Sequence, residues 1–123
     1  MIEGFVNASL EAVVPITLQG PVGQLDGVNA VIDTGFNGYL TLPTMMVADM
    51  ELPVVGEGEA VLADGSEAVF DVYGVTVVWD GQPRFVECGA VGVDPLVGMA
   101  LLDRHNLSIE IENGGSVVIQ ARA

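Results

Sequence analysis

Three dipeptides, Asp64-Gly65, Asp80-Gly81 and Asn113-Gly114, constrain the fold more than any other feature of the sequence. Each separates two runs rich in β-branched and aromatic residues, and in that setting Asp-Gly or Asn-Gly is the strongest short-range signal for a β-hairpin. Gly65 is expected to supply the positive φ that a two-residue turn requires. Half of the residues are hydrophobic, with many valines, and β-branched side chains suit a pleated sheet better than a helix. The sequence therefore predicts an all-β fold.

The alternation of apolar runs and turn residues predicts where the strands lie. Pro15 falls inside one of these runs and favours a sheet edge or a bulge there. Two segments have helical character: T-M-M-V-A-D-M, with Thr44 as its cap, and residues 97–106. The expected strands cover residues 2–6, 13–18, 30–33, 39–42, 59–63, 66–73, 75–79, 84–91, 107–111 and 116–120.

Length and charge limit the classes of protein to consider. The 123 residues suffice for one hydrophobic core, so we expect a single domain over residues 1–123. The net charge is −14, and the only cationic side chains are Arg84, Arg104 and Arg122. A nucleic-acid-binding protein needs a basic surface, and an anionic membrane also attracts cations. Neither is therefore an expected partner, and the simplest interpretation of the charge is solubility.

Targeting and redox signals are also missing from the sequence. No cationic N-terminal segment is present, and no stretch approaches the roughly 18 apolar residues of a membrane span. Cys88 is the only cysteine, so no disulfide within the chain is possible and no oxidising compartment is implied. Cys88 lies in a strand-like run and is expected to be a small core residue. A cytoplasmic location is the default expectation.

Most kinds of catalytic site find no support. His105, the only histidine, follows Arg104 at the end of a predicted helix and is expected to be solvated there. This histidine and Cys88 lie far apart in the sequence, and the carboxylates lack calcium-loop spacing, so we expect no metal. No serine stands in a G-x-S-x-G setting. No phosphate-binding glycine loop is present either, so no cofactor is expected.

The tripeptide Asp33-Thr34-Gly35 is the remaining candidate. Strand-like V-I precedes it, N-G marks a turn just after it, and the apolar run L-T-L follows. Desolvating a carboxylate at the end of a buried strand is costly unless the charge is paired or takes up a proton. Either the strand ends there and Asp33 faces water, or the protein needs an ionisable group in a shielded place.

With these flanking residues, the chain resembles the retropepsin-like aspartic proteases, in particular their small bacterial members. The resemblance rests on V-I-D-T-G-F-N-G-Y-L-T-L-P, on the hairpin A-V-L-A-D-G-S-E-A-V-F and on P-L-V-G-M-A-L-L. In order and spacing these pieces extend from about Ala30 to Ile119. The resemblance implies a closed β-barrel of the retropepsin type, with a flap hairpin and one or two short helices, that functions as a homodimer.

The same resemblance implies roles for individual residues. Asp33 would be the catalytic carboxylate, Thr34 would brace the active-site loop across to the partner subunit, and Gly35 would allow close backbone approach. Residues 59–72 would form the flap, with Asp64-Gly65 at its tip. The residues expected to bind substrate are Phe36, Asn37, Ala63, Asp64, Gly65 and Ser66.

A further element, Leu96-Val97-Gly98, resembles the apolar-apolar-Gly segment that packs behind the catalytic loop of the family. Ala100 stands where members often carry a polar residue. This departure bears on how the dimer is braced more than on the chemistry.

The implied activity is that of an aspartic endopeptidase acting on a peptide or protein substrate. Two carboxyl groups that share one proton can activate a water molecule and polarise the scissile carbonyl at the same time. No other aspartate of the chain stands in a D-[ST]-G pattern. The second carboxyl group must therefore come from another copy of the chain, and a two-fold axis brings identical residues face to face.

Two other interpretations stay open at the level of sequence. The chain could be a non-catalytic retropepsin-like module for dimerisation or peptide binding, where a peptide would add as a strand. It could also be an acidic β-barrel in which D-T-G is only an exposed turn. The intact D-T-G favours the enzyme over the module, because a scaffold has no need of a buried acid. Oligomeric state separates the simple barrel from the other two.

Overall fold

The computed structural model describes all residues from 1 to 123 and is built almost entirely of strands. The elements in chain order are β1 (Ile2–Val6), β2 (Ala12–Gln19), β3 (Leu25–Ile32), β4 (Leu40–Leu42), α1 (Thr44–Asp49), β5 (Val54–Val61), β6 (Glu67–Trp79), β7 (Gln82–Ala90), β8 (Leu96–Val97), α2 (Met99–Leu102), β9 (His105–Ile109) and β10 (Ser116–Ala121).

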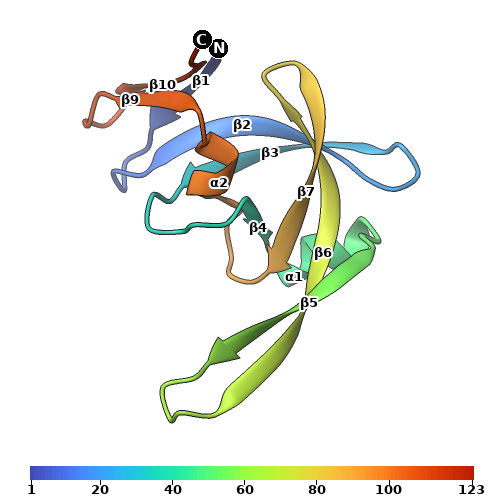
Figure 1. Cartoon of the computed structure of the whole chain (residues 1–123). Coiled ribbons are helices and arrows are strands. Elements are labelled where there is room, and N and C mark those ends of the chain that lie inside the picture. The colour runs from blue at the N-terminus through green and yellow to red at the C-terminus, as the bar shows by residue number, and fades with distance from the viewer.

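The strands form one continuous sheet that closes on itself (Figure 1). Its order is β5-β6-β7-β4-β8-β3-β2-β1-β10-β9, and β6 also pairs with β2. This extra pairing, which includes Leu18 opposite Val77, closes the ring of β2, β6, β7, β4, β8 and β3 into a barrel. The predicted all-β closed barrel with short helices is confirmed.

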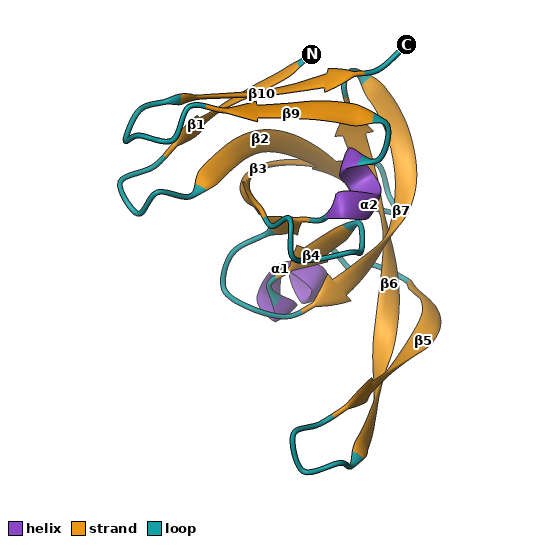
Figure 2. Cartoon of the chain, turned by 60° about the vertical axis from the view of Figure 1, so that its left-hand side comes forward, coloured by secondary structure: helices purple, strands orange, loops and turns teal.

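The barrel encloses a core of 20 buried residues that includes Leu18, Val77, Leu42 and Trp79. Cys88 is 1% exposed, so the expectation that it is a small core residue is confirmed. Strands β1, β10 and β9 continue the sheet beyond β2 and cover one end of the molecule (Figure 2).

Strand β2 changes its partner along its length. Ala12 and Val13 pair with β1, whereas Thr17, Leu18 and Gln19 pair with β6. Pro15 lies between these two sets, in the interval where β2 has a neighbour only on its β3 side. The predicted sheet edge at Pro15 is therefore local, inside a strand that is otherwise paired on both sides.

The turn dipeptides differ in detail. Asp80 and Gly81 both have positive φ, 51° and 80°, and connect Trp79 directly to its partner Gln82 in a two-residue turn. At the β5–β6 turn only Gly65 has positive φ, 85°. There Leu62 N–H donates to the carbonyl of Ser66 at 2.7 Å, which closes a three-residue loop. The expected two-residue turn at Gly65 is thus wrong, although the hairpin and the need for glycine are right.

The β5–β6 hairpin projects from the barrel (Figure 1). Two strands predicted at 66–73 and 75–79 are one strand, β6, because Gly74 stays in extended conformation between them. A side chain at Gly74 would collide with the ring of Phe85 and with Val55, which fill the space above this glycine. The long strand therefore links the barrel wall to the projecting hairpin without a break.

The predicted helices are shorter than expected. Helix α1 begins after Pro43, and Thr44 does not cap it. The helix predicted over 97–106 is only Met99–Leu102, because Leu96–Val97 pair as β8 and the chain returns to a strand at His105. Arg104, with a φ of 66°, makes the turn between α2 and β9. Neither helix is long and apolar enough to cross a membrane.

Candidate active site

The segment that carries D-T-G wraps around the short strand β8. Val31 and Ile32 of β3 run parallel to Leu96 and Val97 of β8, and Leu40 of β4 pairs with Val97 from the other side. Residues 33–39 therefore leave β3, pass β8 and return on its opposite side as β4. This crossing fixes both ends of the segment in the barrel wall.

Asp33 is the first residue after β3 and is half-buried. Its N–H donates to the carbonyl of Val97 at 2.9 Å, and its own carbonyl accepts the N–H of Phe36 at 3.1 Å. Its carboxylate oxygen Oδ1 accepts the N–H of Gly35 at 3.0 Å. Backbone and side chain of Asp33 are thus held in place by the loop and by β8, while no other group of the chain bonds to the carboxylate.

Helix α2 holds the loop from behind. The N–H groups of Gly98, Met99 and Ala100 donate to the carbonyls of Tyr39, Phe36 and Gly38, at 3.0, 2.8 and 3.1 Å. These donors belong to the first turn of α2, whose N–H groups have no partner within the helix. Residues 96–98 thus lie behind the loop, as the resemblance implied. The contact of Ala100 runs through its backbone, so it does not depend on a polar side chain.

Two glycines at this crossing, Gly98 and Gly35, leave no room for a side chain. A Cβ atom on Gly98 would overlap the carbonyl oxygen of Gly38 and the ring of Phe36. A Cβ atom on Gly35 would lie 3.3 Å from Oδ1 of Asp33, tighter than an ordinary contact. Neither glycine has positive φ, so close packing and not backbone conformation requires them.

Thr34 is exposed and lines a pocket of about 280 Å³. Most of the other lining residues are apolar and come from β1, β2, β3, β9 and the turns beside them. A larger hollow of about 410 Å³ lies on the outer side of β2 and β3, between residues 15–17 and 27–29, and contains no ionisable group. Of these two, the smaller pocket adjoins the candidate site through Thr34.

The structure places the predicted substrate-binding residues in two groups. Phe36 and Asn37 lie on the loop beside Asp33, with Phe36 half-buried against Gly38 and Asn37 exposed. Residues 63–66 lie at the exposed tip of the β5–β6 hairpin, and no hydrogen bond joins this tip to the loop. The loop residues are therefore together, and the role of the tip remains a prediction.

At the tip, Asp64 and Ser66 form a local hydrogen-bonded turn. Oδ1 of Asp64 accepts both the hydroxyl of Ser66, at 2.5 Å, and its N–H, at 2.9 Å. The hydroxyl and then the N–H lower the pKa of the Asp64 carboxyl below its usual value. This carboxylate is thus kept charged by its own turn.

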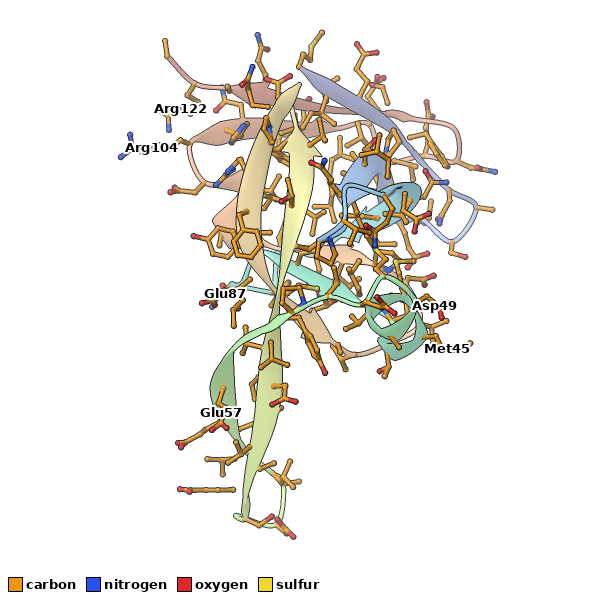
Figure 3. The ribbon with its side chains drawn as sticks, turned by 90° about the vertical axis from the view of Figure 1, so that its right-hand side faces the viewer. Met45, Asp49, Glu57, Glu87, Arg104 and Arg122 are labelled. Carbon is orange, nitrogen blue, oxygen red and sulfur yellow. The ribbon has the colours of Figure 1, made fainter.

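No positively charged group forms a salt bridge with Asp33. None of the three arginines forms a salt bridge with a carboxylate. Arg104 and Arg122 lie together at one end of the molecule (Figure 3), where Arg122 N–H donates to the carbonyl of Arg104 at 2.9 Å. Glu57 lies on the projecting hairpin, far from them in the same view. No group of three or more His, Cys, Asp or Glu side chains is arranged to hold a metal ion.

His105 is not the solvated helix end predicted from the sequence. It begins β9 and is half-buried, and its Nε2 accepts the indole N–H of Trp79 at 3.2 Å. Its Nδ1 lies 2.8 Å from the carbonyl of Asp103. This pair could not be predicted from the sequence, because Trp79 and His105 are 26 residues apart and lie on strands β6 and β9, which do not pair with each other.

Comparison with known proteins defines the fold. No family model matches the sequence, and no match to a curated protein was found. Among solved structures, the chain is similar to a retropepsin-like aspartic protease from Rickettsia conorii, with 15% sequence identity and a TM-score of 0.57. The similarity covers 98% of this chain and 90% of that one. The chain thus has the retropepsin-like fold that the sequence motifs predicted.

Proposed function

We propose that the chain is an aspartic endopeptidase that acts as a homodimer, with residues 1–123 as its single domain. The observation that carries the proposal is the setting of Asp33. Its backbone is held by Val97, its carboxylate is oriented by Gly35, and that carboxylate forms no salt bridge in a half-buried place. A carboxylate with a purely structural role would be expected to have more partners.

The fold supplies one such carboxylate per chain, and the chemistry needs two. The D-T-G sequence occurs once, and no second carboxylate of the chain bonds to Asp33. In a two-fold dimer the two loops meet, and each contributes one Asp33. Because two like charges in close contact do not both ionise easily, the pair holds one proton between them.

The reaction then follows from that single shared proton. The ionised Asp33 takes a proton from a water molecule placed between the two carboxyl groups, and the protonated one donates a hydrogen bond to the carbonyl oxygen of the scissile peptide bond. Water attacks the carbonyl carbon, and the proton taken from water passes to the departing amine. The products are a new carboxyl terminus and a new amino terminus.

The remaining site residues would assist these steps. Thr34 follows Asp33 and would face the other subunit, and Gly35 keeps the loop narrow beside the carboxylate. Phe36 and Asn37 would contact the peptide. The exposed hairpin tip, Ala63 to Ser66, would close over it, because a lid must open to admit a peptide and close to exclude water. We propose a cytoplasmic location as well, in keeping with a lone buried thiol.

Cleavage of a mixed peptide library tests the proposal. Wild type is expected to produce new termini that mass spectrometry identifies, and Asp33→Asn is expected to produce none. Asp26→Asn is the matched control, because Asp26 is an exposed aspartate of β3 away from the loop. Cleavage that persists in Asp33→Asn would rule out the proposed chemistry, and a dimeric wild type without any activity would favour a binding module.

A further inference from the structure

Within the sheet, the projecting hairpin is connected to the barrel through one strand. β5 lies at the edge of the sheet and pairs only with β6, whereas β6 continues into the barrel wall and pairs there with β7 and β2. Figure 1 shows the hairpin extending well beyond the barrel. A segment with few contacts to the rest of a fold has low local stability, so the direction of the hairpin depends on the contacts at its base.

A β-bulge marks the base of β5. Val54 and Gly56 pair with two consecutive residues of β6, so Val55 between them is an extra residue without a partner. A bulge bends its strand and gives the extra side chain a new direction. Here the Val55 side chain reaches the space above Gly74 of β6, where its methyl carbon Cγ1 lies. The irregular position of β5 therefore faces the glycine at which β6 leaves the barrel wall.

The ring of Phe85, from the neighbouring strand β7, fills the rest of the same space. Phe85 pairs with Thr76 and is 65% exposed, so its side chain lies on the outer face of the sheet, diagonally next to Gly74. A Cβ atom on Gly74 would overlap this ring and would lie 2.9 Å from Cγ1 of Val55. Gly74 thus leaves room for a side chain of β7 to meet one of β5, although these two strands do not pair.

We propose that Phe85 is a positioning residue, which holds the β5–β6 hairpin in the direction from which its tip closes over a bound peptide. The inference rests on the proposed function, because only there is the hairpin a lid. Phe85 acts through Val55 and Gly74 and not on the peptide itself. Neither Phe85 nor Val55 belongs to the buried core of the barrel. Without the ring, the hairpin is expected to vary more widely in direction about the bulge.

This role predicts a larger effect on KM than on kcat. When only a fraction of the molecules has the binding-competent conformation, the apparent affinity falls by that fraction. Once the hairpin has closed, the reacting groups are unchanged. Phe85→Ala should therefore raise KM by about two- to fivefold, the size expected for one lost side-chain contact on a sheet face, with kcat near the wild-type value. Phe85→Tyr keeps the ring and should behave as wild type. The melting temperature of both should change little, because Phe85 is exposed.

The distance between two spin labels tests the position of the hairpin without reference to activity. One label is placed at Val61→Cys near the hairpin tip and the other at Asp26→Cys on β3, both exposed positions, while the buried Cys88 stays unlabelled. Labelled chains are diluted with unlabelled ones, so that only distances within one chain are measured. The distance distribution should broaden in Phe85→Ala and keep its wild-type width in Phe85→Tyr. Phe5→Ala is the control, because Phe5 is a 44% exposed phenylalanine of β1, away from the hairpin.

The outcomes separate this inference from the proposed function. If wild type cleaves peptides and Phe85→Ala keeps the wild-type distance distribution, Phe85 does not position the hairpin but the function stands. If the distribution broadens only in Phe85→Ala and wild type never cleaves peptides, Phe85 positions the hairpin but the function fails. Equal broadening in Phe5→Ala or Phe85→Tyr, or a Phe85→Ala variant that loses kcat with an unchanged KM, overturns the inference.

Discussion

The indole N–H of Trp79 donates a hydrogen bond to Nε2 of His105, with 3.2 Å between the two nitrogen atoms. The rings meet edge to face, with centroids 5.8 Å apart. Because Nε2 accepts, the neutral ring carries its proton on Nδ1, which lies 2.8 Å from the carbonyl of Asp103. The pair joins the end of β6, whose other end forms the projecting hairpin, to the start of β9.

Replacing His105 should leave the indole N–H without its acceptor. Trp79 is buried, and a buried donor left without a partner costs about 1–3 kcal/mol. His105→Leu should therefore lower the free energy of unfolding in urea by about this amount, whereas His105→Gln, whose side-chain oxygen can accept a hydrogen bond, should lose less. Equal losses in the two variants would show that the hydrogen bond does not stabilise the fold.

Gly98→Ala should destabilise the crossing behind the active-site loop. The φ and ψ of Gly98, −102° and 177°, are open to any residue, so the cost comes only from the overlap with Gly38 and Phe36. Overpacking of this kind costs about 1–3 kcal/mol, which urea unfolding would measure. Gly27→Ala is the control, because a Cβ atom there meets nothing within 4 Å. If Gly98→Ala is as stable as wild type, Gly98 is not packed closely against Gly38 and Phe36 as described.

Cys88 should be unreactive in the folded protein. Burial raises the pKa of its thiol to about 12, so almost no thiolate, the reactive form, exists at pH 8. A thiol reagent should label Cys88 only as fast as the protein unfolds. Rapid labelling of the folded protein at pH 8 would contradict the burial of this residue.

The same pKa difference predicts a loss of stability in alkali. The folded value, about 12, lies above the ordinary 9.0, so between these pH values the unfolded chain loses a proton that the folded chain keeps. The contribution of the buried Cys88 thiol to the free energy of unfolding is therefore fully present below pH 9 and is lost as the pH rises towards 12. The unfolding free energy of wild type should therefore fall more steeply in this range than that of Cys88→Ala. If the unfolding free energies of the two proteins fall equally with pH, ionisation of Cys88 does not contribute to the loss of stability.

Gly65→Val should impair peptide cleavage more than folding. Gly65 has a φ of 85° in the three-residue loop at the hairpin tip, and a β-branched residue is strained there, at about 1–3 kcal/mol. The tip is exposed, so this strain should change the hairpin without lowering the melting temperature of the barrel much. Gly65→Asn should stay near wild type, because Asn tolerates positive φ. Equal activities for the two variants would show that the tip takes no part in catalysis.

Much of the fold could be predicted from local sequence, for physical reasons. The Asp80-Gly81 turn and strand β1 were predicted correctly because their signals are complete within a few residues. The strand β8 could not be read from the sequence. Leu96 and Val97 lie next to good helix formers, and only pairing with β3 and β4 holds them extended.

For the candidate site, the residues of the D-T-G motif could be predicted from the sequence, but the groups that surround them could not. Asp33, Thr34 and Gly35 are adjacent in the sequence, so a motif could identify them. The carbonyl of Val97 that holds Asp33, and the pocket beside Thr34 that Leu10, Ile109 and Ile111 line, depend on segments that are far apart in the sequence and meet only in the folded chain. The positive φ of Leu10 carried no sequence signal, since leucine rarely adopts it.

If one active site contains Asp33 from two chains, mixing wild-type and variant subunits should lower the activity by a fraction that can be calculated. Asp33→Asn keeps the size of the side chain and removes its ability to share or accept the catalytic proton, so the variant should dimerise and be inactive. Equal amounts of wild type and variant are mixed, and exchange is verified with a mass tag. Random pairing leaves about a quarter of the dimers with two aspartates, so activity per total dimer should fall to about a quarter of the wild-type value. A value of about one half after complete exchange would mean that each chain works alone, and the shared pair would be contradicted.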